Sequence, residues 1–444
     1  MTSTDTRTRV APDRVHELLA KHMLVDGYAL VLDLVRSRGA YLHDARGNRD
    51  LLDCYASFST VPLGYNHSTF EDPEFRERIL HAAINKPANS DLYTTEMAEF
   101  VATFSQTFPE SLAHLLFFID GGALAVENAM KAAFDWKKRK NLAAGRGELG
   151  NQVVHFREAF HGRSGYTLSV TNTDPRKTLY FPKFDWPRIT NPKLSFPTTE
   201  QVLERVELEE QRAIAEIRQA LVDRRHDVAA ILIEPIQGEG GDNHFRAEFL
   251  RALRDIADEE EILLIFDEVQ TGFGATGKWW GFEHFGVEPD LLAFGKKTQV
   301  CGIAGSRRLD EVDSVFQVSS RINSTWGGNL VDMIRCQRVV ETIWAENLLE
   351  RATTVGAVML DGLRQLEQRF AGRLGNSRGR GLFLAVDLPD RETRQKTLAG
   401  MRDHGLLGLA SGERSIRFRP SLIFEERHAQ EALGRLAQAL ESTL

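Results

Sequence analysis

Short runs of apolar residues alternate with longer amphipathic stretches through the middle of the chain. The apolar runs lie at 115–119, 153–156, 228–233, 262–266 and 291–294. A run of this length predicts a strand that is covered on both faces, as in the parallel sheet of an α/β protein. Between these runs, 124–138 and 247–258 have the spacing of helices. The pattern therefore predicts an α/β fold whose mostly parallel sheet is built by right-handed crossovers.

The two ends of the chain carry a different pattern, in which short strands mix with helices. Strand-like runs lie at 29–32, 40–42, 51–54, 381–386 and 415–419. A long amphipathic helix is expected from about residue 331 and a closing helix from Glu425. This mixture predicts a small α+β lobe to which both ends contribute. We therefore expect 1–58 and 331–444 to form the two parts of a small domain, and 59–330 to form a large domain.

Asp267 stands where the apolar run 262–266 ends, and this position requires a cationic partner. A carboxylate beside apolar walls is stable only if a positive charge balances it, and a protonated pyridine nitrogen would serve. The next run, 291–294, ends in Gly295-Lys296-Lys297. The carboxyl ends of parallel strands meet at one edge of a sheet, so we expect Asp267 and Lys296 there together. Pyridoxal phosphate (PLP) enzymes need this arrangement, because the Lys forms a Schiff base and the Asp keeps the ring nitrogen protonated.

The pair Asp267-Glu268 also has simpler interpretations. Acids at strand ends bind Mg²⁺ in nucleotide hydrolases, and such a pair in isolation is more often a strand-end cap beside solvated lysines. The stretch 145–150 matches G-x-G-x-x-G, but it follows a predicted helix and precedes a strand, the reverse of a dinucleotide site, so we expect a surface loop. No G-x-x-x-x-G-K-[ST] motif precedes the acidic pair, which argues against a nucleotide-dependent ligase or ATPase. A non-catalytic binding protein on the same fold remains open.

A helix start opened by glycine offers a phosphate site. The predicted helix 124–138 follows Asp120-Gly121-Gly122-Ala123. Free N–H groups at such a start bind an anion, helped by the helix dipole. The basic run 137–140 is expected to be a solvated helix end that complements the dipole. The stretch 175–225, which contains prolines and then a long charged helix, is expected to be peripheral.

Other candidate binding groups follow strands at the expected site edge. Phe160 can stack on a flat cofactor ring, and Arg163 can bind a carboxylate through two hydrogen bonds. The acidic, Gly-rich turn 234–241 belongs on the site side of an open α/β sheet. The stretch 321–329 offers hydroxyl and amide donors to a phosphate, and the loop 57–67 is equally well a pocket wall or a linker between lobes.

Composition narrows the expected partners and location. The formal net charge of −8 argues against binding to nucleic acid or to an anionic membrane. Three scattered cysteines, Cys54, Cys301 and Cys336, do not make a disulfide framework or a metal site and fit a reducing cytoplasm. Residues 1–14 are polar, so we expect a frayed end without a secretory signal. No apolar run approaches the ~20 residues that cross a bilayer. We expect a soluble, cytoplasmic protein.

Taken together, the motifs resemble the class-III, fold-type-I PLP aminotransferases, which act on an amino group remote from the carboxylate. The resemblance covers about residues 27 to 435. It is carried by FHGR at 160, EPIQGEGG at 234, DEVQTGF at 267, FGKK at 294, STWGGN at 324 and IRFRP at 416. It implies a fold like that of aspartate aminotransferase, with a large domain on a mostly parallel sheet and a small α+β domain. It also implies a homodimer with shared active sites.

The resemblance assigns roles to individual positions. Lys296 would form the Schiff base and move the proton, while Asp267 would pair with the pyridine nitrogen. Further cofactor contacts are implied for Phe160 on the ring, Gln270 on the ring hydroxyl, Gly122 and Ala123 on the phosphate, and Ser324 and Thr325 on the phosphate of the other subunit. Many relatives have a hydroxyl residue where Ala123 stands, so the phosphate would depend more on backbone and partner chain. The candidate substrate contacts are Arg163, Glu239, Arg417, Asn323 and Phe58.

The segments DGGALAVENAMKAAFDWK and AFGKKTQVCGI are most similar to family members that act on L-lysine. The implied reaction transfers the 6-amino group of L-lysine to 2-oxoglutarate. Its products are glutamate and 2-aminoadipate 6-semialdehyde, which cyclises to piperideine-6-carboxylate. Transamination of 4-aminobutyrate or ornithine stays open, because FHGR, EPIQ and IRFRP are similar in 4-aminobutyrate aminotransferases.

One pocket would have to accept two differently shaped substrates. The reacting carbon of lysine bears no carboxylate, whereas that of 2-oxoglutarate does. In the family, a Glu masks an Arg and swings aside for the oxoacid, and the matching residues are Glu239 and Arg417. Arg163 would hold the distal carboxylate in both half-reactions.

Overall fold

The computed structural model describes residues 10–443. Most of the end expected to be frayed, residues 1–9, lies outside the described residues. Inside them, Pro12–Arg14 form one 3₁₀ turn (η1), and α1 (Val15–Ala20) follows directly.

Within residues 10–443, seven strands form one large sheet in the order β3-β11-β10-β9-β6-β4-β5. The strands are β3 (Leu115–Phe118), β4 (Gln152–Phe156), β5 (Arg188–Ile189), β6 (Val228–Ile233), β9 (Leu263–Asp267), β10 (Leu291–Phe294) and β11 (Gly302–Gly305). From β10 to β5 all neighbours are parallel, whereas β11 is antiparallel to both of its neighbours. The mostly parallel sheet expected from the apolar runs is confirmed. Neither β5 nor β11 was predicted, because both strands are short.

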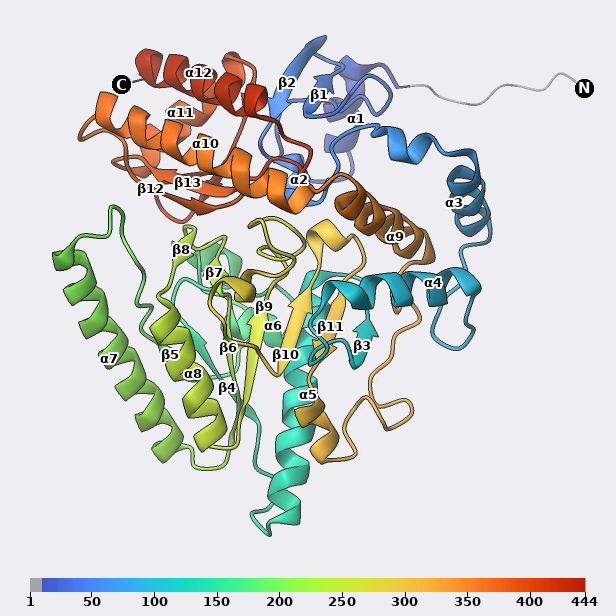
Figure 1. Cartoon of the computed structure of the whole chain (residues 1–444), viewed down its shortest axis with the longest axis vertical. Helices are drawn as coiled ribbons and strands as arrows, with labels where there is room; N and C mark the ends of the chain where they lie inside the picture. Colours follow the sequence, from blue (N-terminus) through green and yellow to red (C-terminus); the bar gives the residue numbers. More distant parts are fainter. Residues whose placement is uncertain (1–9, 444) are drawn as a thin grey trace, which may run out of the picture.

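The apolar runs are continuous because each strand feeds two cores. On β6, Ile231 and Ile233 face a core that includes side chains of α7 (Glu200–Asp223) and α8 (Ala247–Glu259). Ala230 and Leu232 face a second core built with α5 (Gly122–Ala143). Figure 1 shows α7 and α8 beside each other along one flank of this sheet. Neighbouring residues of one strand thus point to opposite faces of the sheet, and both faces are buried.

Helix α5 continues past its predicted end to Ala143, so the basic run 137–140 lies inside the helix. Lys137 is only 1% exposed, and its Nζ donates to the backbone carbonyl of Glu261 at 2.6 Å. The expectation of a solvated basic end is therefore wrong for Lys137, which satisfies a carbonyl just beyond the end of α8. Burial lowers the pKa of Lys137 to about 8. The glycine-rich stretch 145–150 is a loop between α5 and β4, as predicted.

Strands from both ends of the chain share one sheet. β1 (Tyr41–Asp44) pairs with β2 (Arg49–Asp53), and β2 pairs in parallel with β14 (Leu406–Leu407). The predicted strand at 29–32 is wrong, because only Leu32 pairs there, in an isolated bridge to Asp44. The proposed domain boundaries at 58 and 331 stay a prediction.

A second small sheet forms the rest of this lobe. It contains β12 (Gly375–Arg380), β13 (Phe383–Asp387), β16 (Ser415–Phe418) and β15 (Leu409–Ser411), in that order and antiparallel. Figure 1 shows it with α10 (Leu348–Arg369), α11 (Arg391–Asp403) and α12 (Glu426–Thr443) above the large sheet. The single long helix expected from residue 331 is two helices, α9 (Leu330–Ala345) and α10. They are separated at Asn347, whose φ of +50° is left-handed.

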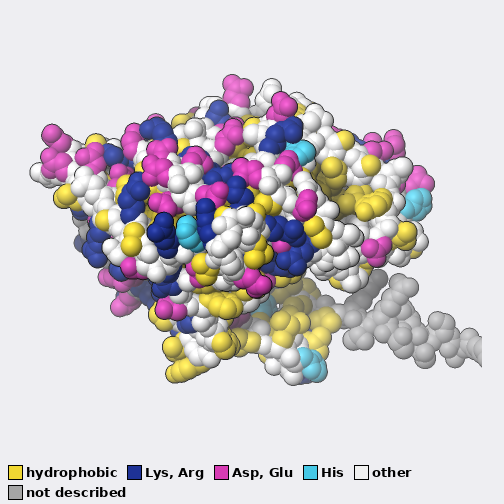
Figure 2. Space-filling model, turned by 90° about the horizontal axis from the view of Figure 1, so that it is seen from below, with side chains coloured by type: hydrophobic (Ala, Val, Ile, Leu, Met, Phe, Trp, Pro, Cys, Tyr) yellow, Lys and Arg dark blue, Asp and Glu magenta, His cyan; other side chains and the backbone are white. Residues whose placement is uncertain are grey.

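The remaining elements are short or lie at the periphery. The helices are α2 (Ala56–Ser59), α3 (Pro73–Asn85), α4 (Thr95–Phe104) and α6 (Gly165–Val170), and the strands are β7 (Ile236–Gln237) and β8 (Asn243–His244). None of the helices among the described residues is long and apolar enough to cross a membrane. Figure 2 shows Lys and Arg interspersed with Asp and Glu over one face of the molecule. The expectation that nucleic acid is not a partner stays a prediction.

Candidate active site

Two adjoining cavities lie at the carboxyl ends of β6, β9 and β10. The first has a volume of about 330 Å³ and is lined by Gly122, Ala123, Phe160, His161, Gly162, Arg163, Glu234, Asp267, Val269, Gln270 and Lys296. The second, of about 240 Å³, is lined by Phe58, Phe160, Arg163, Glu239, Gln270, Lys296, Leu409, Arg417 and Arg419. The two cavities share Phe160, Arg163, Gln270 and Lys296. Most of the predicted site residues are therefore brought together, and the second cavity lies between the large sheet and the small lobe.

Asp267 ends β9 and is held by a buried histidine. Its Oδ2 lies 2.8 Å from Nδ1 of His161, and its Oδ1 accepts from the N–H of Val269 at 3.1 Å. His161 is 2% exposed, and its backbone N–H donates to Oγ1 of Thr171 at 2.9 Å. His161 belongs to the FHGR motif but was not among the predicted site residues. The available signal was a histidine in a turn at the site edge.

A second buried carboxyl, Glu234, follows β6. Its two oxygens accept from the N–H of Phe160 at 3.0 Å and from the N–H of Gly238 at 2.9 Å. Burial raises the pKa of Glu234 to about 7; His161 lowers this pKa and Asp267 raises it further. Glu234 thereby fixes Phe160 to the loop after β6, which is a structural role the sequence did not show.

Of the two adjacent lysines, only Lys296 lines the cavities. It follows β10 with a left-handed φ of +51°, and no hydrogen bond from its Nζ occurs among residues 10–443. Burial lowers the pKa of Lys296, while nearby Asp267 opposes this shift. Lys297 is buried, its Nζ contacts Oγ of Ser59, and burial lowers its pKa to about 7. An unpaired amine with a lowered pKa is suited to act as a nucleophile or base.

The first cavity fits a flat anionic cofactor such as PLP. Gly122 and Ala123 line this cavity at the first turn of α5, where amides have no intrahelical partners, and no side chain caps this helix start. The turn after β4 lies against this helix start because Gly162 has a φ of +132°, and a Cβ there would stand 2.5 Å from that of Ala123. Amides for a phosphate, Phe160 for a ring, and Asp267 with Lys296 are thus present in one cavity.

The second cavity contains the predicted pair of Glu239 and Arg417, which we call the gate pair. Nη2 of Arg417 donates to Oε2 of Glu239 at 2.7 Å, and Nη1 donates to Oε1 of Gln270 at 3.1 Å. Lys177 also donates, from Nζ to Oε1 of Glu239 at 2.7 Å. Burial alone would raise the pKa of Glu239, but Arg417 and Lys177 together lower it. The expectation that 175–225 is peripheral is therefore wrong for Lys177.

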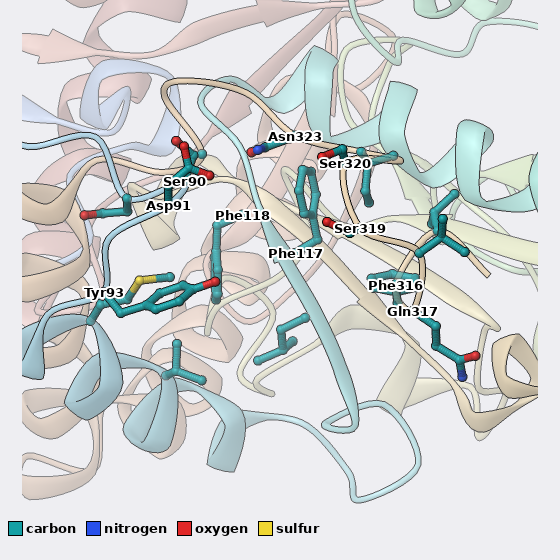
Figure 3. Close-up of a pocket in the computed structure, with 18 residues that line it drawn as sticks. Ser90, Asp91, Tyr93, Phe117, Phe118, Phe316, Gln317, Ser319, Ser320 and Asn323 are labelled. Atoms are coloured by element: carbon teal, nitrogen blue, oxygen red, sulfur yellow. The ribbon is translucent and has the colours of Figure 1, made fainter. Parts of the chain in front are cut away.

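Phe58 also lines the second cavity, so this part of the loop 57–67 is a pocket wall. Its backbone is in a run of left-handed residues, with a φ of +60° at Phe58 itself. The other loop candidates lie elsewhere in the described chain. Asn323 lines a separate pocket with Phe117 and Ser320 (Figure 3), and neither Ser324 nor Thr325 lines the two cavities of the same chain. Their predicted roles stay predictions.

The chain is similar to aminotransferases over nearly its whole length. Residues 24–440 match the model of the family Aminotransferase class-III. An L-lysine-epsilon aminotransferase of Amycolatopsis lactamdurans is 49% identical, with 98% of both chains covered. The 4-aminobutyrate aminotransferase of Sus scrofa is 33% identical, over 98% of this chain and 90% of the relative. A solved lysine aminotransferase from M. tuberculosis, in the internal aldimine form, superposes with a TM-score of 0.95 and 48% identity, covering 98% of this chain and 100% of that one.

Proposed function

The chain belongs to the class-III aminotransferase family, and we propose on this premise that it transfers the 6-amino group of L-lysine to 2-oxoglutarate, with PLP as cofactor. The products are glutamate and 2-aminoadipate 6-semialdehyde, which cyclises to piperideine-6-carboxylate. The observation that carries the proposal is the pair of joined cavities that share Lys296. The choice of lysine is supported by relatives named for it at 49% identity, against 33% for a 4-aminobutyrate aminotransferase. Membership in this family of enzymes also argues against the two alternatives, a nucleotide-dependent ligase or ATPase and a non-catalytic binding protein.

Bound PLP supplies an electron-accepting ring for the substrate carbon that loses its proton. The residues of the first cavity hold and orient this ring. Asp267, fixed by His161, would accept a hydrogen bond from the ring nitrogen and keep it protonated. Phe160 would pack on the ring, Gln270 would bond the ring hydroxyl, and the amides at the start of α5 would bind the phosphate. The Nζ of Lys296, which lines both cavities, would hold the cofactor covalently and would carry the proton at the reacting carbon.

The gate pair lets one cavity accept both substrates. While Glu239 covers Arg417, the pair is neutral and presents no free cation to the 6-carbon of lysine, which bears no carboxylate. When 2-oxoglutarate enters, Arg417 binds the carboxylate next to the reacting carbon and Glu239 turns aside. Arg163, which lines both cavities, holds the distal carboxylate in each half-reaction.

We also propose that the active enzyme is a homodimer. Ser324 and Thr325 would reach the phosphate bound by the partner subunit, which compensates for the missing hydroxyl at Ala123. Support comes from large apolar side chains on the surface, since Leu92 is 74% exposed and Tyr93, which lines the pocket of Figure 3, is 80% exposed. A cytoplasmic location remains part of the proposal.

Isotope transfer tests the proposed reaction directly. Purified holoenzyme is incubated with 2-oxoglutarate and with lysine labelled by ¹⁵N at either nitrogen, and glutamate is analysed by mass spectrometry. We expect label in glutamate only from the 6-position. 4-Aminobutyrate and ornithine serve as competing donors. Faster transfer from either of these donors than from lysine would overturn the assignment of the substrate.

A further inference from the structure

The carboxylate of Glu239 is shared between two cations, one on each oxygen. Oε2 accepts from Arg417 on β16, and Oε1 accepts from Lys177, each at 2.7 Å. Lys177 comes from a separate segment, the 3₁₀ turn η4 (Pro175–Lys177), and is largely buried. Its Nζ also donates to Oγ1 of Thr173 at 3.0 Å and lies 5.1 Å from the ring centre of Phe160. Lys177 is therefore fixed in place beside the second cavity.

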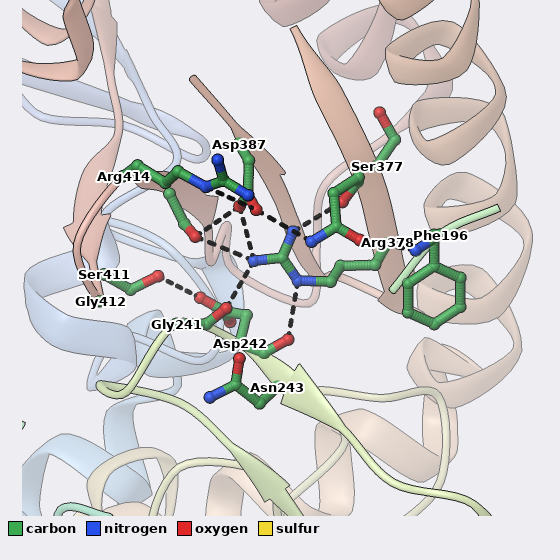
Figure 4. Close-up of polar contacts among 12 residues, drawn as sticks. Phe196, Gly241, Asp242, Asn243, Ser377, Arg378, Asp387, Ser411, Gly412 and Arg414 are labelled. Atoms are coloured by element: carbon green, nitrogen blue, oxygen red, sulfur yellow. Dashed lines mark hydrogen bonds and ion pairs between the residues drawn. The ribbon is translucent and has the colours of Figure 1, made fainter. Parts of the chain in front are cut away.

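The backbone that carries Glu239 is anchored to the small lobe. The N–H of Gly412 donates to the carbonyl of Glu239 at 2.9 Å. Further along the loop, Nε of the buried Arg378 donates to the backbone carbonyl of Asp242 at 2.9 Å. The hydroxyl of Ser411 donates to Oδ2 of Asp242 at 2.5 Å. Figure 4 shows Arg378 and Ser411, from the strands of the small lobe, in contact with Asp242 of this loop. Glu239 can therefore leave Arg417 by rotation of its side chain, without displacement of this loop.

We propose that Lys177 is a specificity-determining residue, which retains Glu239 when 2-oxoglutarate takes Arg417. This inference rests on the proposed function of the gate pair. A carboxylate that leaves its cation inside a partly buried site is destabilised unless a second positive charge balances it. Lys177 supplies that charge without competing for the substrate position. Because Glu239 is attracted to Lys177 as well as to Arg417, less free energy is needed to separate Glu239 from Arg417.

The expected consequence is asymmetric between the two half-reactions. Lysine uses the closed gate pair, in which Arg417 already balances the charge of Glu239. 2-Oxoglutarate needs the open state, which Lys177 stabilises. Loss of Lys177 should therefore weaken dicarboxylate binding while lysine loses much less.

The direct test is the binding of glutarate to the holoenzyme, because glutarate has the two carboxylates of 2-oxoglutarate but no reactive carbonyl. In Lys177→Met, which keeps the apolar stem over Phe160, we expect glutarate to bind about fivefold to tenfold more weakly and the KM for 2-oxoglutarate to rise in parallel. The matched control is Arg176→Met, which removes the same charge from the same turn. Arg176 is exposed and pairs with Asp174, so its loss should change glutarate binding less than twofold.

A double-mutant cycle separates an effect through Glu239 from simple attraction of a dianion. In a Glu239→Gln background, Lys177→Met should change glutarate affinity no more than Arg176→Met does. A loss of the same size in both backgrounds would overturn the proposal, and so would equal losses with lysine and glutarate. If Lys177→Met is unstable to heat, Lys177→Arg and Lys177→Gln take its place, and the proposal requires that only Arg retains affinity.

Failure of this inference and failure of the proposed function give different results. Glutarate binding does not depend on which amine is the donor. Normal turnover of lysine with unchanged glutarate affinity in Lys177→Met would overturn the role of Lys177 alone. Absence of lysine turnover in the wild type would overturn the proposed substrate, while the glutarate cycle would still decide the role of Lys177.

Discussion

The carboxylate of Asp267 lies 2.8 Å from Nδ1 of the buried imidazole of His161. An ionised carboxylate only accepts hydrogen bonds, so Nδ1 is the donor in this contact whenever Asp267 carries its charge. Because Thr171 in turn fixes the backbone of His161, the imidazole determines how Asp267 faces the first cavity. His161 is thus a positioning residue for the group that is proposed to contact the cofactor.

Removal of the imidazole should loosen Asp267 without removing its charge. We expect His161→Phe to lower kcat about 10- to 100-fold with the fold retained, the usual range for loss of an outer-shell partner. Asp267→Asn removes the charge itself and should lose several orders of magnitude. Both variants are compared by steady-state kinetics and by the absorbance of bound cofactor. Unchanged turnover in His161→Phe would contradict the positioning role.

The position of the cofactor on the chain distinguishes two adjacent lysines. Lys296 lines both cavities, whereas Lys297 is buried against Ser59. After borohydride reduction of the holoenzyme, peptide mapping should find the pyridoxyl group on Lys296. Lys296→Ala should still bind PLP weakly but lose turnover. A pyridoxyl group on Lys297 would contradict the assignment.

Much of this site follows from the sequence because strand ends define it. The continuous apolar runs of β9 and β10 mark strands covered on both faces, and the first polar groups beyond them are Asp267 and Lys296. Parallel strands place such residues at one edge. The α/β class was therefore predicted from hydrophobicity alone, whereas the aspartate aminotransferase-like fold and the roles of Glu239 and Arg417 required the family resemblance.

The contacts that could not be predicted join segments that are distant in the sequence, and no local sequence pattern links the two partners. Lys177 and Glu239 are 62 residues apart, and Lys177 belongs to a short turn with no periodicity. Lys137 has a charge that predicts exposure, but it meets a carbonyl of another element that no local pattern indicates. Strand β11 has only four residues, with glycine at both ends, and gives little strand signal.

A buried histidine should make the fold sensitive to acid. His155 on β4 is 1% exposed, and burial lowers its pKa to about 3, with a smaller contribution from Arg188. The unfolded chain binds this proton near pH 6.5, so between pH 6.5 and 3 it binds more protons than the folded chain. The free energy of unfolding is therefore not reduced by His155 above pH 6.5, and it decreases as the pH falls from 6.5 towards 3.

His155→Gln removes this titration and gives the measurable difference. Between pH 7.5 and 5.0, the wild type should lose about 2 kcal/mol more of its free energy of unfolding than the variant. Urea denaturation at pH 7.5 and 5.0 measures the free energy of unfolding of each protein. The value at pH 5.0 is compared with the value of the same protein at pH 7.5. Equal losses in the two proteins would mean that His155 also binds a proton in the folded state.

The gate pair makes a prediction about the choice of donor. Glu239 neutralises Arg417 through a 2.7 Å contact, and this ion pair keeps Arg417 from attracting a carboxylate next to the reacting amine. In Glu239→Ala, Arg417 is open at all times, so the half-reaction with 2-oxoglutarate should stay comparatively active. Selectivity should shift away from the 6-amino group of lysine and towards α-amino donors such as glutamate. Single-turnover absorbance changes of the holoenzyme with each donor measure this shift, and equal losses with lysine and glutamate would mean that Glu239 does not select between substrates.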